Sequence, residues 1–95
     1  MYLLVVYDVS DDVKRQRLAR VLEAWGLARI QRSAFVGRLS HARARDLARL
    51  VERIIDPETD VVHMVRLQDW EWRSAIVVGS PRWGPGRVEG VKLLR

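Results

Sequence analysis

Residues 3–12 read Leu-Leu-Val-Val-Tyr-Asp-Val-Ser-Asp-Asp, and this stretch is the strongest indication of the fold class. A continuous apolar run is typical of a β-strand buried on both faces, and we expect a strand over about residues 2–9. Asp8 interrupts the run near its end, and Ser10 and two more aspartates follow. Because Ser and Asp are preferred helix N-caps, a helix is predicted directly after the strand. Asp8 is therefore placed at a strand end, where mixed α and β folds commonly carry functional groups.

Two roles for Asp8 follow from this position. Its carboxylate can hydrogen-bond the turn, as aspartate often does, or it can ligate a hard cation such as Mg²⁺ through oxygen. One carboxylate is a poor metal site, but a two-fold axis beside the first strand would bring in a second copy of Asp8. Asp11 and Asp12 are predicted to belong to the first turn of the helix.

The rest of the chain alternates between helical and strand patterns, and no repeat, low-complexity segment or linker divides it. Apolar periodicity places the further elements. In order, we expect a helix at 11–25, a strand at 27–39, a helix at 41–55, and strands at 61–67, 73–78 and 88–93. Read literally, the order is β-α-β-α-β-β plus a tail strand. We predict a ferredoxin-like α+β sandwich, with two helices on one face of a four-stranded antiparallel sheet.

Residues 1–95 are expected to form one domain, because this length suits a single hydrophobic core. Residues 78–95 form a C-terminal extension that follows a connection rich in proline and glycine. Its apolar residues need a surface to bury them: Val88, Val91, Leu93 and Leu94. Since a ferredoxin-like sheet has open edges, a tail strand from a second protomer can cover one of them, and the tail can also fold back on its own sheet.

Composition excludes several classes of protein. Cysteine is absent, so the chain has neither disulfides nor thiolate metal ligands. No apolar run approaches the roughly 18 residues that a membrane span needs, and the first residues lack the basic start of a secretory signal. We expect a cytoplasmic protein without membrane contact.

The net charge of +5 comes from 15 arginines and only two lysines, against 12 acidic residues. Arginine binds phosphate through a planar fork and stacks on bases, so a small arginine-rich domain is a candidate nucleic-acid binder. A genome composition or thermal adaptation that favours arginine produces the same excess. Charge alone leaves both explanations open.

The arginines form two groups in the expected fold. Arg45, Arg49 and Arg53 lie four residues apart on the second helix, where like charges repel each other unless they meet phosphates or remain solvated. Asp46 and Glu52 lie close enough in sequence to offset part of this repulsion. A second group surrounds Asp8: Arg15, Arg17, Arg29 and Arg32.

Aromatic and histidine residues carry weaker signals. Trp70, Trp72 and Trp83 can stack on bases or pack in a core or interface. His41 and His63 show no metal-ligand spacing. The chain has no P-loop, dinucleotide-binding fingerprint, Ser-His-Asp order or RNA-recognition motif.

Three segments together carry a family resemblance. They are Tyr7-Asp8-Val9-Ser10-Asp11-Asp12, then Arg15, Arg17 and Leu18, and then residues 26–37, which read Gly-Leu-Ala-Arg-Ile-Gln-Arg-Ser-Ala-Phe-Val-Gly. This combination closely resembles the CRISPR-associated endoribonuclease family, the small dimeric subunit of the spacer-acquisition complex. The resemblance covers about residues 2–40, and the second helix and residues 76–79 match it in pattern. Residues 70–72 and 79–86 match no pattern of the family.

The resemblance implies a ferredoxin-like homodimer whose C-terminal strands cross to the partner sheet, with Mg²⁺ or Mn²⁺ between the two copies of Asp8. It implies cleavage of single-stranded RNA or double-stranded DNA, and partnership with the CRISPR adaptation integrase, for which the dimer is a DNA-spanning scaffold. Residues that it links to activity are Tyr7, Asp8, Arg15, Arg17, Arg29 and Phe35. Residues that would contact nucleic acid are Arg15, Arg17, Arg29, Arg32, Arg45 and Arg49.

Two other classes of function stay open beside this one. The first is a toxin-type ribonuclease of related fold that acts alone on RNA. The second is a ferredoxin-like regulatory module that binds a small ligand, although a neutral ligand would not require the arginine excess.

Overall fold

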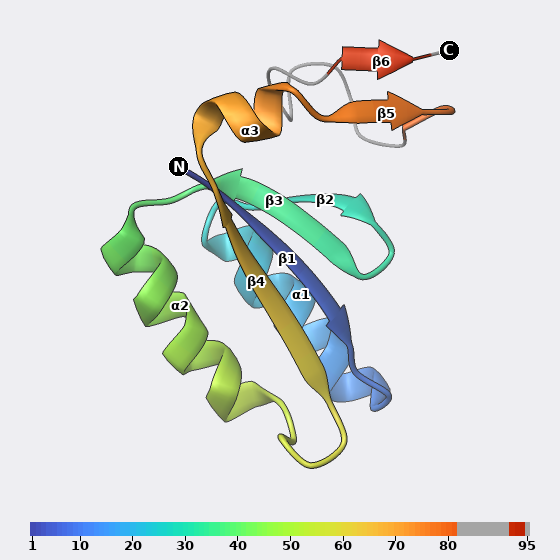
Figure 1. The fold of residues 1–95 in the computed structure, drawn as a ribbon. Helices are drawn as coiled ribbons and strands as arrows, with labels where there is room; N and C mark the ends of the chain where they lie inside the picture. Colours follow the sequence, from blue (N-terminus) through green and yellow to red (C-terminus); the bar gives the residue numbers. More distant parts are fainter. Residues whose placement is uncertain (82–91, 95) are drawn as a thin grey trace.

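The computed structural model describes residues 1–81 and 92–94. The elements, in chain order, are β1 (Tyr2–Asp8), α1 (Asp12–Ala24), β2 (Ala28–Gln31), β3 (Ala34–Arg38), α2 (His41–Ile54), β4 (Val61–Leu67), α3 (Asp69–Arg73), β5 (Ile76–Val78) and β6 (Lys92–Leu94). Up to the end of β4 the order is βαββαβ, and both helices lie on one side of the sheet (Figure 1). This arrangement confirms the predicted ferredoxin-like fold.

Strand β1 lies inside the four-stranded sheet, whose order is β2-β3-β1-β4. It pairs antiparallel with β3 on one side and with β4 on the other. A strand with two neighbours and helices over one face buries most of its side chains, which explains the apolar run of residues 3–7. Both helices have the side-chain caps that their sequences indicate: Asp11 accepts from the Lys14 N–H, and Ser40 from the Arg43 N–H.

The main core lies between the sheet and the two helices. Leu3, Val5 and Tyr7 of β1 point toward it, and they pack with buried residues of both helices, which include Leu18, Leu22, Leu47 and Val51. A smaller apolar cluster on the other face of the sheet joins Tyr2, Val36 and Trp72. Val13 is 74% exposed, because it lies in the first turn of α1, away from the apolar face of this helix.

The single strand expected at 27–39 is wrong, because the segment forms a hairpin. Strands β2 and β3 pair antiparallel around a turn at residues 32–33. This turn, Arg32-Ser33, contains none of the glycine or asparagine that usually indicates a two-residue hairpin, so the two strands appear as one pattern. The turn resets the alternation of side chains. Phe35 of β3 is fully buried against the helices.

The strand expected at 73–78 is confirmed over its second half, as β5 (Ile76–Val78), and wrong over its first half. Residues Asp69–Arg73 form the short helix α3, in which the Gln68 N–H donates to the Glu71 carboxylate at 2.9 Å as part of a capping box. Strand β5 is therefore short, and it pairs in parallel with β6 in a separate two-stranded sheet (Figure 1). Of the expected last strand, residues 88–91 lie outside the described residues. The crossing of this tail to a partner stays a prediction.

Gly37 is required by a close approach between β3 and the two residues that precede β2, Gly26 and Leu27. A Cβ atom at this position would lie 2.9 Å from the Leu27 Cα atom and 3.0 Å from the Gly26 carbonyl oxygen. Both contacts are with backbone, which cannot rotate away as a side chain can.

We expect Gly37→Ala to lower the free energy of unfolding by about 1–3 kcal/mol, the usual cost of overpacking. Urea denaturation followed by circular dichroism measures this change. Gln16→Ala on the exposed face of α1 is the control and should shift the midpoint little. A Gly37→Ala midpoint equal to that of the wild type would contradict the close approach.

Candidate functional site

Tyr7 and Asp8, adjacent in sequence, lie on opposite faces of the sheet. Neighbouring side chains of a strand point to opposite faces. Tyr7 is paired in register with Val62 and belongs to the core under the helices, where it is 4% exposed. Asp8 is paired with Val61 at the end of β1 and is exposed on the face without the two long helices. The expected site therefore has two parts.

The first part is an aromatic and arginine cluster on the helix side. The rings of Tyr7 and Phe35 stack with their centroids 6.3 Å apart. The Arg29 guanidinium lies 4.8 Å over the Phe35 ring and donates a hydrogen bond to the Arg32 carbonyl oxygen. The Tyr7 N–H donates to the Ser33 carbonyl oxygen at 3.0 Å, which ties the hairpin turn to β1. The structure thus brings together three of the predicted residues from three different strands.

The Tyr7 hydroxyl is shielded from solvent, and the described part of the chain offers it no hydrogen-bond partner of normal geometry. Burial raises the pKa of Tyr7 above its ordinary value of 10. The Arg29 guanidinium, through its charge and a hydrogen-bonding approach to the hydroxyl that falls short of normal geometry, and the charge of Arg15 oppose this rise. The phenol is consequently neutral near pH 7 and can donate one hydrogen bond. A buried polar group without a partner is uncommon in folded proteins.

Arg15 connects this cluster to the loop that follows Asp8. Its guanidinium donates to the carbonyl oxygens of Val9 at 3.2 Å and Ser10 at 3.4 Å, and it forms an ion pair with Asp12. These contacts hold the first residues after β1 against the start of α1. Arg15 is therefore a positioning residue for the strand end that carries Asp8.

The remaining predicted residues near Asp8 are more dispersed. Arg17 is exposed on α1, and Arg32 is exposed in the β2–β3 turn. Asp11 caps α1 and Asp12 lies in its first turn, as predicted, so neither joins Asp8 as a metal ligand.

Among the described residues, Asp8 belongs to no larger cluster of possible metal ligands. Over residues 1–81 and 92–94, no group of three or more His, Asp or Glu side chains could hold a metal ion. A carboxylate is a suitable donor for a hard cation, so Asp8 fits Mg²⁺ only as half of a shared site. The same face of the sheet carries exposed Val6, Val61 and Val65, which is an apolar surface next to the carboxylate.

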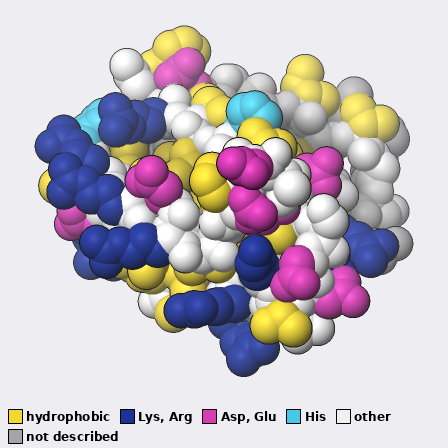
Figure 2. All heavy atoms as spheres, turned by 90° about the horizontal axis from the view of Figure 1, so that it is seen from below, with side chains coloured by type: hydrophobic (Ala, Val, Ile, Leu, Met, Phe, Trp, Pro, Cys, Tyr) yellow, Lys and Arg dark blue, Asp and Glu magenta, His cyan; other side chains and the backbone are white. Residues whose placement is uncertain are grey.

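A basic surface runs along the exposed side of helix α2. Arg45, Arg49 and Arg53 are exposed on the side of the helix opposite its buried Leu47 and Val51. Figure 2, which views the molecule from the end where β1 finishes, shows basic side chains gathered on the flank that α2 occupies and acidic side chains nearer the centre.

The structure adds Arg66 of β4 to this surface, because its side chain reaches toward Arg45. Sequence reasoning missed Arg66. The available signal was its parity with Val62 and Met64, which places it on the helix side of the sheet.

The tryptophans have different roles. Trp72 is buried and packs against Tyr2 with ring centroids 6.0 Å apart, so base stacking by Trp72 is wrong and core packing is confirmed. Trp70 is 66% exposed on α3. Trp83 lies outside the described residues.

Comparison with known proteins identifies the family. A family model described as CRISPR associated protein Cas2 matches residues 1–75. The chain belongs to the Cas2 family. It is 41% identical over 80 residues to CRISPR-associated endoribonuclease Cas2 1 of Archaeoglobus fulgidus, which covers 84% of this chain and 85% of that protein. It is 33% identical over 85 residues to CRISPR-associated endoribonuclease Cas2 1 of Pyrobaculum aerophilum, which covers 90% and 87%.

A third relative joins two proteins in one chain. The CRISPR-associated endonuclease Cas1/endonuclease Cas2 fusion of Thermoproteus tenax is 49% identical over 55 residues, which are 58% of this chain and 21% of the fusion.

Solved structures support the Cas2 fold. A Thermus thermophilus protein described as hypothetical, TT1823, matches with a TM-score of 0.75 and 28% identity over 86% of this chain and 94% of its own. Streptococcus pyogenes Cas2 matches with a TM-score of 0.63 and 30% identity over 79% of this chain and 96% of its own. Among the described helices, none is long and apolar enough to cross a membrane.

We expect Tyr7→Phe to raise the free energy of unfolding by about 1 kcal/mol at pH 7, because it removes a buried hydroxyl without a partner. Since the pKa of Tyr7 is raised on folding, the neutral phenol stabilises the fold fully below pH 10, and this contribution is lost as pH rises through the folded pKa. The advantage of Tyr7→Phe should therefore grow above pH 10. Urea denaturation at pH 7 and pH 10.5 measures both effects.

Tyr2→Phe is the matched control, because Tyr2 is equally buried but lies in the other apolar cluster. A Tyr7→Phe protein that is less stable than the wild type at pH 7 would show that the hydroxyl makes a stabilising hydrogen bond.

Proposed function

We propose that this protein is a CRISPR adaptation subunit, a homodimer that binds nucleic acid and assembles with a Cas1 integrase. The observation that carries this proposal is the Thermoproteus tenax relative in which Cas1 and Cas2 are one chain, because fusion keeps two proteins that act together at high local concentration. The family match favours this function over the toxin ribonuclease and the regulatory module.

Nucleic-acid binding rests on the arginines. Arg17, Arg32, Arg45 and Arg49 are exposed, so their guanidinium groups are available to phosphates. Among the described helices, α2 carries the most arginines, but its other side is buried against the sheet, so it is not a free basic helix of the kind that enters a DNA groove. Phosphate contacts should therefore dominate, and the affinity for duplex DNA or single-stranded RNA should be salt-sensitive and largely independent of sequence.

The dimer rests on the open face of the sheet. Val6, Val61 and Val65 are each at least 40% exposed there, and a second copy of the same face would bury them. A two-fold axis beside β1 would bring the two copies of Asp8 together at this surface.

Phosphodiester hydrolysis is the catalytic part of the proposal, with Mg²⁺ or Mn²⁺ held by Asp8 of both protomers. Such an ion supplies a water of lowered pKa and neutralises charge on the scissile phosphate. Arg15 holds the loop after Asp8 and so sets the direction of the carboxylate. Phe35 supports the Arg29 guanidinium, and Tyr7 stacks on Phe35 under the helices, on the face opposite Asp8, so both aromatic residues act by positioning.

We expect Val65→Lys to convert the dimer to monomers, because it places a charge in the proposed interface while leaving the main core intact. Sedimentation velocity at micromolar concentration measures the change, and we expect the dimer dissociation constant to rise at least about tenfold. Val13→Lys on α1 is the matched control, because Val13 is also exposed but lies on the helix side. A wild-type monomer at this concentration would contradict the proposed dimer.

We expect Asp8→Asn to lower the rate of divalent-dependent cleavage at least about a hundredfold. The amide keeps the size of the side chain but loses the charge that holds the cation. Duplex binding, which rests on arginines, should change little. Gel assays with Mg²⁺ titration and fluorescence anisotropy measure the two effects. Asp11→Asn is the control, since asparagine preserves the helix cap. Full cleavage by pure Asp8→Asn protein would contradict the assignment.

A further inference from the structure

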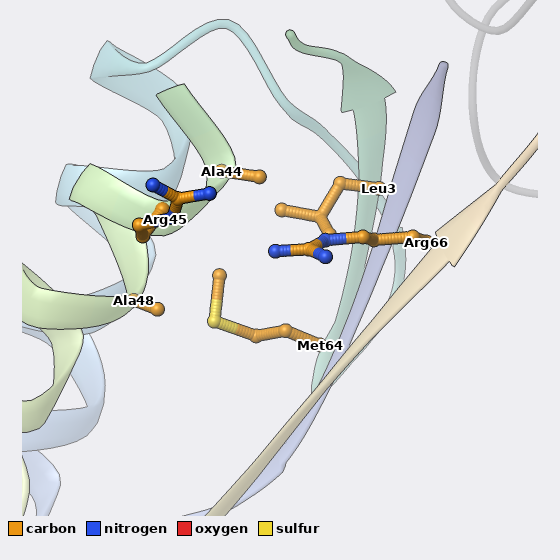
Figure 3. Close-up of a pocket in the computed structure, with 6 residues that line it drawn as sticks. All are labelled: Leu3, Ala44, Arg45, Ala48, Met64 and Arg66. Atoms are coloured by element: carbon orange, nitrogen blue, oxygen red, sulfur yellow. The ribbon is translucent and has the colours of Figure 1, made fainter. Parts of the chain in front are cut away.

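A groove lies between α2 and the edge strand β4, on the flank of the molecule away from the Tyr7 cluster (Figure 3). Its volume is about 400 Å³. The residues that line it are Leu3, Ala44, Arg45, Ala48, Met64 and Arg66. None of the roles described above for Tyr7, Asp8, Arg15 or Phe35 uses this groove.

Two guanidinium groups converge on the groove from different elements. Arg45 extends from α2, Arg66 extends from β4, and the two side chains face each other across the gap (Figure 3). Beneath them the wall is apolar, since Leu3 and Ala44 are buried and Met64 packs on the main core. Such a wall excludes water from one side of a bound ion, which strengthens its attraction to the arginines.

Neither guanidinium has an acidic partner in the part of the chain that the structure describes. The salt bridges found among the described residues engage Arg15, Arg38 and the chain N-terminus, and neither Arg45 nor Arg66. Two like charges facing each other repel, and an anion between them converts this repulsion into attraction. The planar fork of arginine matches the oxygens of a phosphate in particular.

The groove lies at the opposite end of the sheet from Asp8. In the β1–β4 ladder Leu3 is paired with Arg66 and Asp8 with Val61, so the two places are five residues apart, or about 17 Å along the strand. Helix α2 runs from the groove toward the Asp8 end (Figure 1). Arg49 and Arg53 follow Arg45 at intervals of about 6 Å along the helix.

We propose that this groove binds a phosphodiester of a nucleic-acid backbone between Arg45 and Arg66, and that Arg49 and Arg53 continue the contact along α2 toward Asp8. The inference rests on the proposed nucleic-acid binding and adds a second contact surface to it. A polyanion with regularly spaced charges matches a row of arginines, whereas a single acidic side chain of a protein partner would leave Arg49 and Arg53 without a counter-charge.

The test compares Arg45→Gln, Arg66→Gln and the double variant with the wild-type protein. Fluorescence anisotropy measures binding to a labelled 20-base-pair DNA duplex and to a single-stranded RNA of 20 nucleotides, each over a series of salt concentrations. Arg73→Gln on α3 is the matched control, because it removes the same charge on the other face of the sheet. Circular dichroism melting establishes that every variant is folded, and Arg45→Lys/Arg66→Lys keeps the charge without the fork.

Each single variant should bind about tenfold more weakly, as expected for loss of a charged hydrogen bond. The double variant should lose less than the product of the two single effects, because both arginines hold one phosphate. It should also lower the slope of log affinity against log salt by about 0.9 on the duplex or about 0.7 on the single strand. The affinity of the lysine variant should lie between those of the double glutamine variant and the wild type. The nucleic acid, DNA or RNA, whose affinity falls more in the double glutamine variant is the one whose backbone occupies the groove.

Two results would overturn the inference while leaving the proposed function intact. One is a double variant that binds both nucleic acids as tightly as Arg73→Gln does. The other is independent, fully multiplicative losses, which would mean that the two arginines do not share a phosphate. Wild-type protein that binds neither nucleic acid would instead refute the proposed function together with the inference.

Discussion

Strand β1 is the element on which the rest of the structure depends, because it hydrogen-bonds to β3 on one side and to β4 on the other. Its alternating side chains divide the molecule into two faces. One set packs under α1 and α2, and the other lies on the opposite face of the sheet, together with Trp72 and the exposed valines. A shift of one residue in this register would exchange the two sets, so the pairing of β1 determines which groups become core and which become surface.

Because of this division, the functional groups of Tyr7 and Asp8, which are adjacent in the sequence, lie on opposite faces of the sheet. Tyr7 is held under the helices with Phe35 and Arg29, while Asp8 is exposed on the opposite face. The buried cluster supports the strand end and supplies one neutral hydroxyl near two positive charges. In the proposed dimer, a second protomer would supply the other carboxylate of the site at Asp8. Arg15 links the two parts, because its guanidinium binds the backbone between Asp8 and α1.

The arginine excess has a spatial order that composition does not reveal. Some arginines are engaged within the fold: Arg15 in loop contacts, Arg38 with Asp69, and Arg43 over the Trp25 ring. Others are exposed along α2, and one of them, Arg45, lines the groove together with Arg66. The first group stabilises the junctions between elements. The second group, the exposed arginines of α2 together with Arg66, has no acidic partners among the described residues. Its charges are therefore the ones most available to attract a phosphate backbone.

The sequence by itself determined what depends on neighbouring residues. The buried strand ending at Asp8, the two capped helices and the strand at 61–67 were all predicted within a residue or two, because apolar periodicity and capping are local signals. The family was also visible in residues 7–37. Only the tertiary structure decided that residues 27–39 fold as a hairpin, that Phe35 is buried, that residues 69–73 are helical, and that Arg45 faces Arg66. The burial of Phe35 and the approach of Arg45 to Arg66 depend on contacts between residues distant in the chain, and no local pattern records which strands pair or in what register.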